Sequence, residues 1–192
     1  AGSPPLHYHV SDLESQPLPE GAFDVVFACH SVHHIEGLDA LFANVRRALR
    51  PGGIFHLQEY VGPDRFQWTD AQLEGVNEFQ ATLPDRLRLL PNGIPRGQVG
   101  RPTVAEVIAV DPSEAVCSSR IIEALGRHLR MRERRDLGGA LLHMGLSGIA
   151  QNFNAGNAED VAHMQRLFDM EDEWMAQGRI GSDFAVLIAT RD

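Results

Sequence analysis

Cysteine is scarce in this 192-residue chain, which contains only Cys29 and Cys117. Two thiols provide neither a disulfide framework nor a CxxC metal-binding pair, so we expect inert thiols in a reducing cytoplasm. The sequence also has no apolar run that approaches the ~20 residues needed to cross a bilayer, and no signal peptide is visible. Hydrophobic residues make up 43% of the composition and charged residues 22%, which indicates a globular chain with a core.

Positive charge is in deficit as well, since the net charge is −9 with the histidines counted as neutral. This balance argues against a broad surface for nucleic acid or for an anionic membrane. Local basic clusters at residues 46–50 and 130–135 lie within periodic apolar segments and are typical of solvated edges. We therefore predict neither a nucleic-acid partner nor a membrane partner.

The opening third of the chain alternates strands with a helix. Residues 6–10 alternate apolar and polar side chains, and residues 23–29 (FDVVFAC) form a largely apolar run of the kind found in buried strands. Residues 38–49 have a helical period that stops before Pro51, and residues 54–61 form the next strand. A strand–helix–strand unit with a buried first strand predicts a right-handed parallel crossover and a Rossmann-like α/β fold.

The remaining two thirds are predicted to be mostly helical. Asp70 is a plausible N-cap for the first of these helices, and Asp111 for the third. The expected elements are helices at 70–83, 103–110, 112–125, 139–153 and 158–176, a loop at 90–102, an outer strand at 129–137 and a last buried strand at 183–190. We expect one domain over residues 1–192, with the helices of residues 70–119 forming a cover insertion.

Several short phrases occur in a recognisable order. They are SDLE at 11–14, LPEGAFDVV at 18–26, SVHHI at 31–35, NVRRALRPGGIF at 44–55 and SDFAV at 182–186. Together they resemble the class I S-adenosylmethionine-dependent methyltransferases, particularly the small-molecule branch. The resemblance implies a mostly parallel sheet with an antiparallel final strand, and transfer of a methyl group from S-adenosylmethionine to a small-molecule acceptor.

The resemblance also implies a cofactor side. Asp12 with Leu13 matches the acidic loop beside the adenine, where a carboxylate suits the exocyclic amine; the alternative is that Asp12 only caps the turn before Pro17. Ala28, Cys29 and His30 lie at the carboxyl end of a parallel strand, where open α/β sheets bind ligands. These residues are the predicted cofactor contacts.

The acceptor side is predicted near the carboxyl ends of the strands at residues 23–29 and 54–61. His30 is a candidate general base, because an imidazole removes a proton near neutral pH, and Glu59 is a second catalytic candidate. A structural histidine at residue 30 is the alternative. The predicted substrate-binding residues are His34, Tyr60, Arg65, Trp68 and His143. For Trp68 the alternative is a contact at a helix entry, and for His143 it is an ordinary helical position.

The histidines at residues 30, 33 and 34 have the spacing HxxHH after a cysteine. A zinc site needs a third and a fourth ligand in reach, and the sequence does not supply them. Because the resemblance explains His33 and His34 as ordinary family residues, we predict no metal ion.

The glycine-rich turn that holds the methionyl part of the cofactor in this family is not found in the sequence. Gly52–Gly53 and Gly138–Gly139 do not replace it, because neither pair follows a buried strand and opens a helix. The chain starts at what corresponds to the family's third strand, so residues 23–29 should present an uncovered apolar edge. We expect a homodimer, a swapped segment or a relocated strand at residues 6–10 to cover it.

Three functions follow. The first is methyl transfer, or a truncated form of such an enzyme; the lack of the glycine-rich turn argues against activity of this chain alone. The second is a non-catalytic methyltransferase-like remnant that acts as a dimerisation or binding module. The third is a hydrolase-like activity of Ser31 with a histidine and an acid, against which the lack of a GxSxG elbow argues.

Overall fold

The computed structural model describes residues 5–192, which contain a four-stranded sheet in the order β1-β2-β4-β3. The strands are β1 (Phe23–Cys29), β2 (Leu49–Tyr60), β3 (Arg130–Gly138) and β4 (Phe184–Thr190). β1 pairs in parallel with β2, whereas β4 runs antiparallel to both of its neighbours, β2 and β3. Three strands therefore share one direction, which confirms the predicted Rossmann-like, mostly parallel sheet with an antiparallel final strand.

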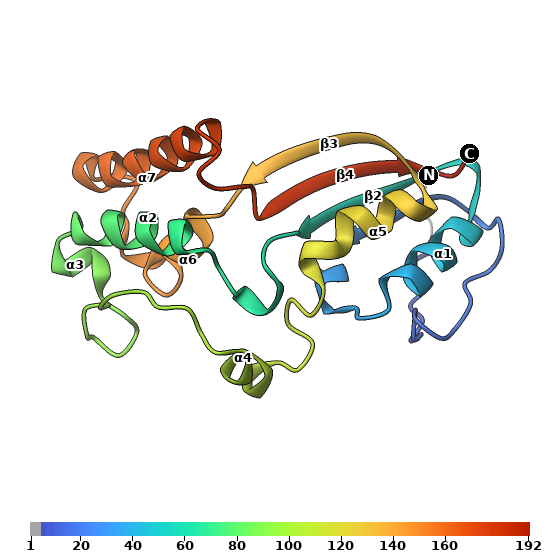
Figure 1. Ribbon diagram of the computed structural model, residues 1–192, viewed down its shortest axis with the longest axis horizontal. Helices are drawn as coiled ribbons and strands as arrows, with labels where there is room; N and C mark the ends of the chain where they lie inside the picture. Colours follow the sequence, from blue (N-terminus) through green and yellow to red (C-terminus); the bar gives the residue numbers. More distant parts are fainter. Residues whose placement is uncertain (1–4) are drawn as a thin grey trace.

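One face of the sheet is covered by two helices, α1 (Leu38–Ala48) and α5 (Ile121–His128) (Figure 1). Their apolar stripes meet the inward side chains of the strands in one core cluster, in which Phe42 and Leu125 pack with Phe55 and Leu57. Every second side chain of each strand points to this face. On the helices, residues three or four positions apart share the side that faces the sheet.

The opposite face of the sheet is open. Val25, Phe27 and Ile54 alternate with the core residues and are 55%, 61% and 40% exposed. β1 is also one of the two edge strands, because it pairs with β2 and with no other strand of the sheet. The predicted uncovered apolar edge at residues 23–29 is therefore confirmed.

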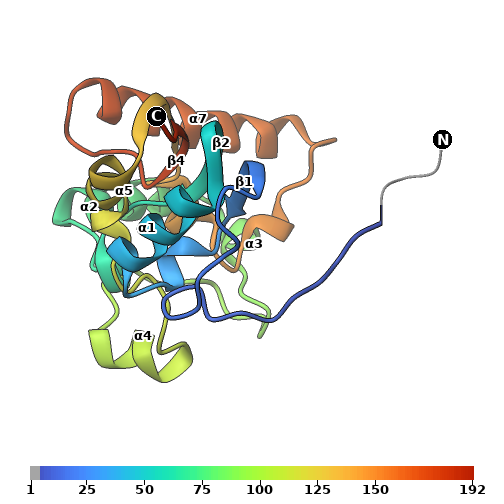
Figure 2. The ribbon, with the colours of Figure 1, turned by 90° about the vertical axis from the view of Figure 1, so that its right-hand side faces the viewer.

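The prediction of a strand at residues 6–10 is wrong. The segment has no strand pairing, and Leu6, Tyr8 and Val10 are 79%, 88% and 105% exposed. Figure 2 shows the start of the described chain, ahead of the loop beside α1, running away from the other elements. Alternation alone does not make a strand, because its backbone groups need a neighbour to pair with.

A second helical group lies beyond the end of the sheet (Figure 1). It consists of α2 (Asp70–Ala81), α3 (Asp85–Arg88), α6 (Leu142–Leu146) and α7 (Ala158–Ala176). Val76, Phe79, Leu141, Leu167 and Trp174 form its core. Residues 140–180 therefore pack against the first half of the segment 70–119, for which a cover insertion is predicted. Over residues 5–192, no helix is both long and apolar enough to span a bilayer.

Helix starts differ from prediction where a cap or a turn intervenes. Thr69, not Asp70, caps α2, in a capping box with Gln72. α4 (Val104–Val110) follows Thr103 as expected. The helix predicted at 112–125 begins only at Ile121, after a 3-10 turn, η3 (Ser118–Arg120). Asp111 instead accepts hydrogen bonds from Ser113 in a tight turn, and a positive φ at Ala115 interrupts a helix.

The helix predicted at residues 139–153 is broken as well. α6 and a 3-10 turn, η4 (Ala150–Asn152), occupy parts of this segment. Gly139 and Gly148 have φ values of +86° and +73°, which a continuous helix does not accommodate. Two further 3-10 turns, η1 (Val32–His34) and η2 (Asp64–Phe66), follow β1 and β2 directly.

Candidate functional site

Glu59 organises the carboxyl ends of β1 and β2. Its side chain is fully buried, and its Oε2 accepts hydrogen bonds from the backbone N–H groups of Ser31 (2.8 Å) and Val32 (2.6 Å). Its Oε1 accepts from the N–H of Tyr60 (2.7 Å) and lies 2.5 Å from Nδ1 of His33. Burial by itself would raise the pKa of Glu59, but these donors and the charge of His33 lower it. An ionised carboxylate with every lone pair engaged holds the loop after β1 in place.

His33 and His34 lie in η1, next to the turn that precedes η3. His33 is 8% exposed, and its Nε2 is 3.5 Å from Oε1 of Glu114. Burial opposes a charge on the His33 ring, but Glu59, Glu114 and Asp111 together raise its pKa. His34 is half-buried, with Nδ1 3.1 Å from the hydroxyl of Ser113 and 3.8 Å from a carboxylate oxygen of Asp111.

An aromatic cluster surrounds the ring of Tyr60, the last residue of β2. Phe66, His143 and Phe184 lie with their ring centroids 5.4, 6.2 and 5.3 Å from that of Tyr60. The hydroxyl of Tyr60 donates to the carbonyl of Pro63, and burial raises the pKa of this phenol. Partial burial among these rings lowers the pKa of His143, so a neutral imidazole is favoured there.

His30, a predicted catalytic residue, comes directly after β1, and its Nε2 lies 3.4 Å from Nε2 of Gln58. It is exposed, sits at a positive φ of 47°, and its ring centroid is 5.8 Å from that of Phe184. Through Phe184 it borders the aromatic cluster of Tyr60 and His143. Positive φ at a residue with a side chain is uncommon and is found often at functional turns.

Arg65 and Trp68 have different surroundings. The guanidinium of Arg65 donates to the backbone carbonyls of Pro112 (2.6 Å) and Glu114 (3.1 Å), so it secures the turn before η3. Trp68 stacks on Phe66 with a centroid distance of 5.4 Å and an interplanar angle of 17°, which extends the aromatic cluster.

An apolar groove of about 320 Å³ adjoins this region. It lies between η2 and α4, with Phe66, Val107 and Val110 forming its apolar wall. Asp111 and Glu114 line the same groove and bring the carboxylates next to His33 and His34 to its surface. The groove is therefore an apolar space with a polar, titratable border.

The loop predicted to contact adenine is fixed by α1. Asp12 accepts hydrogen bonds from the backbone N–H of Glu14 and the hydroxyl of Ser15, so it does stabilise its own turn, and these bonds lower its pKa. Leu13 and Ala28 pack against the same core cluster. The loop and β1, which carry the predicted cofactor contacts, therefore pack on the same hydrophobic core.

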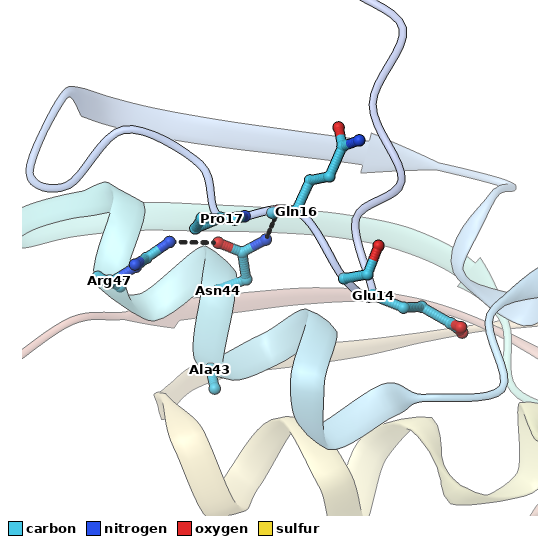
Figure 3. Close-up of a pocket in the computed structure, with 7 residues that line it drawn as sticks. Glu14, Gln16, Pro17, Ala43, Asn44 and Arg47 are labelled. Carbon is cyan, nitrogen blue, oxygen red and sulfur yellow. Dashed lines mark hydrogen bonds between the residues drawn. The ribbon is translucent and has the colours of Figure 1, made fainter.

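Asn44 of α1 connects that loop to the helix, as Figure 3 shows. Its amide donates to the carbonyls of Leu13 (3.2 Å) and Gln16 (2.8 Å). Its carbonyl accepts from the N–H of Leu18 (2.8 Å) and from Arg47 (3.1 Å). A hollow of about 280 Å³ lies between these groups, but Asn44 already uses its hydrogen-bonding capacity within the chain.

Sequence reasoning missed Glu114, Phe66 and Phe184 as members of this region. Glu114 lies in an irregular turn that was predicted to be helical, and no local period indicates that it faces a histidine some 80 positions away. Phe184 belongs to one of the recognised phrases, but its contact with Tyr60 depends on the antiparallel pairing of β4 with β2.

Comparison with known proteins finds similarity to methyltransferases over the first part of the chain. A family model described as a methyltransferase domain matches residues 1–57. A sterol 24-C-methyltransferase of Gibberella zeae is 31% identical over 67 residues, which are 35% of this chain and 18% of the relative. A malonyl-[acyl-carrier protein] O-methyltransferase of Serratia marcescens is 32% identical over 80 residues, which are 41% of this chain and 31% of the relative.

The match to the methyltransferase-domain model covers 57 of the 192 residues, at the start of the sequence. This segment includes the loop of Asp12, all of β1, His30, and His33 with His34. Among solved structures, a geranyl diphosphate C-methyltransferase from Streptomyces coelicolor aligns with 96% of this chain and 52% of its own, with a TM-score of 0.49 and 14% identity. The chain spans about a fifth to a third of the length of the two curated relatives.

Proposed function

We propose that this chain forms the acceptor-side part of a class I S-adenosylmethionine-dependent methyltransferase that acts on a small molecule. The observation that carries the proposal is the position of the aromatic cluster. Tyr60, Phe184 and His143 lie at the carboxyl end of β2, beside the exposed His30 at the carboxyl end of β1. Open α/β sheets bind their ligands at this edge, and aromatic walls suit an apolar or planar acceptor.

The relatives support a small acceptor without identifying it. Their names describe methyltransferases for a sterol and for an acyl-carrier-bound malonyl group. The groove beside Phe66 is apolar with an acidic border, and its volume of about 320 Å³ falls at the lower end of the range for small-molecule pockets. We propose a compact, largely apolar acceptor, which a protein with a net charge of −9 does not repel.

The residues present fit one end of the cofactor. Asp12 and Leu13 would hold the adenine side, and Ala28, Cys29 and His30 would line the edge of β1; Cys29 and His30 are exposed there. When bound, the cofactor supplies the methyl group from its sulfonium. The glycine-rich turn for the methionyl end is not in this sequence, so we propose that a further segment provides it, on the open side of β1.

The catalytic roles divide between His30 and Glu59. We propose that His30 removes or orients the acceptor proton, since it is exposed and not held by a carboxylate. Glu59 is proposed to position the loop that carries His30, because both of its oxygens are occupied by donors from that loop and from Tyr60. Alignment of the acceptor with the methyl group is then the main contribution to rate.

Calorimetry with S-adenosylmethionine tests the proposal. Saturable binding by the purified chain that weakens in Asp12→Ala supports a cofactor side at this loop. A Ser15→Ala variant is the control, because it removes one bond of the turn and leaves the carboxylate in place. If the chain binds no cofactor in any form, alone or extended at its N-terminus, the enzymatic proposal fails.

The open face of the sheet favours a second candidate, a non-catalytic module that associates with a second copy. Val25, Phe27 and Ile54 form an exposed apolar strip next to an unpaired strand edge. Sedimentation velocity distinguishes the two: a dimer that dissociates in Phe27→Lys supports the module, and a monomer at high concentration removes it.

Cys29 and Cys117 are free thiols, which suits the cytoplasmic location that we propose. The backbone N–H of Ser31 binds Glu59, and within residues 5–192 its hydroxyl has no histidine as a hydrogen-bond partner. The geometry therefore offers no support for a Ser31 nucleophile.

A further inference from the structure

His33, His34 and Glu114 come together from two separate segments, η1 and the turn before η3. One ring nitrogen from each histidine and one carboxylate oxygen of Glu114 lie within 4.8 Å of one another. We propose that these three residues bind a divalent zinc ion. Two imidazoles and one carboxylate form a donor set that catalytic zinc sites use, with a fourth position left open.

The separations are somewhat longer than those around a bound zinc ion. Around a tetrahedral zinc with ligand distances of about 2.0–2.1 Å, neighbouring ligand atoms are about 3.3 Å apart. Nε2 of His33 and Oε1 of Glu114 are already 3.5 Å apart. The rings of His33 and His34 lie side by side, with centroids 4.1 Å apart. Small side-chain rotations are therefore enough to complete the coordination.

Each histidine also has an oxygen partner behind it. Nδ1 of His33 is 2.5 Å from the buried carboxylate of Glu59, and Nδ1 of His34 is 3.1 Å from the hydroxyl of Ser113. A hydrogen bond at Nδ1 fixes the tautomer in which Nε2 carries the free lone pair. Metal-binding histidines are oriented in the same way by a carboxylate or another acceptor, so both rings are prepared for coordination through Nε2.

A protonated His33 paired with Glu59 and Glu114 would explain the same contacts without a metal. The two explanations differ at Glu114. Its side chain is 26% exposed, and its oxygen stays 3.5 Å from Nε2, which is long for a charge-assisted hydrogen bond. That distance fits two ligands with an ion between them better than it fits a direct ion pair. Glu114 also lines the apolar groove, so the ion would lie at its border.

Titration calorimetry with zinc chloride tests the site directly. The chain is first treated with a chelator and dialysed, and the titration is run at about pH 8, where the proton competes less for imidazole. We expect one zinc per chain, and at least about a tenfold loss of affinity in Glu114→Gln and in His34→Gln. Glu106→Gln, a carboxylate on the same groove but outside the cluster, should bind zinc like the unmodified chain.

His34 and Glu114 are partly exposed, so we expect their variants to fold. Far-ultraviolet circular dichroism checks that each variant is folded before its affinity is compared. If the unmodified chain shows no saturable zinc binding, or if both variants retain its affinity, the site is overturned. Equal losses in Glu106→Gln would also overturn it, since they would indicate a diffuse acidic surface. Zinc affinity is measured without cofactor or acceptor, so the result is independent of methyl transfer.

Discussion

Asp183 is a buried acid between the sheet and the second helical group. It is 4% exposed and accepts a hydrogen bond from the side-chain amide of Gln72 (2.9 Å). Its backbone connects to Val61 and to Gly138. Burial, together with the charge of Glu171, raises the pKa of Asp183 from 3.8 to about 7, against the opposing effect of the Gln72 hydrogen bond.

This raised pKa makes the stability of the chain depend on pH in a defined direction. The folded state holds the proton more tightly than the unfolded state, so the contribution of Asp183 is complete below about pH 4. It is lost as the pH rises to about 7, and remains lost above that value. A shift of about three units corresponds to about 4 kcal/mol at most, of which about 2.3 kcal/mol falls between pH 5 and pH 7.

Asp183→Asn should remove this dependence, because an amide has no proton to lose and its oxygen still accepts from Gln72. The variant is expected to be more stable than the unmodified chain at about pH 8, and its advantage should grow by about 2–3 kcal/mol between pH 5 and pH 8. Urea unfolding followed by far-ultraviolet circular dichroism at both pH values measures this difference.

The control is Asp172→Asn, an exposed position on α7. Its effect on the free energy of unfolding should be the same at both pH values. A constant difference for Asp183→Asn between pH 5 and pH 8 would refute the reasoning, because it would mean that ionisation of Asp183 has no cost in the folded chain. A variant that is less stable at pH 8 would refute it more strongly.

The remaining predictions concern the site loop and the two faces of the sheet. Glu59→Gln should destabilise the chain by about 3 kcal/mol in urea unfolding, since its new amide group would face backbone donors; unchanged stability would contradict this. Phe55→Ala should cost about 3–5 kcal/mol, and Phe27→Ala less than about 1, in the same assay; equal losses would mean that the open face is covered in solution. Asn44→Ala should accelerate hydrogen exchange at the N–H of Leu18, measured by nuclear magnetic resonance, because that group loses its acceptor.

The elements that could be predicted from sequence are those whose pattern is local. The helix expected at residues 158–176 is α7 without a change of bounds, since an N-cap at Asn157 and a helical period define it. β1 and β4 are also found where apolar runs of strand length predict them. The strand expected at residues 6–10 shows the limit, because strand formation needs a partner that a short alternating pattern does not provide.

In the candidate site as well, local features could be predicted from the sequence and long-range contacts could not. Its position at the ends of β1 and β2 could be predicted, because parallel strands place their carboxyl ends at one edge. The contact between His33 and Glu114 could not, since it joins two irregular turns far apart in the chain. Backbone conformations such as the positive φ of Ala115, which turn Glu114 toward η1, are not encoded in any hydrophobic period.

The role of Glu59 shows how the structure refines the sequence-based hypothesis. An acid at the end of a parallel strand is typical of a catalytic group, yet the donors around Glu59 leave it no free lone pair. The same bonds explain why a histidine follows Val32: the ring of His33 completes the set of donors that a buried carboxylate requires. We therefore propose that Glu59 acts through the loop that it holds. Its loss should lower stability and zinc affinity together, whereas loss of His34 should lower zinc affinity alone.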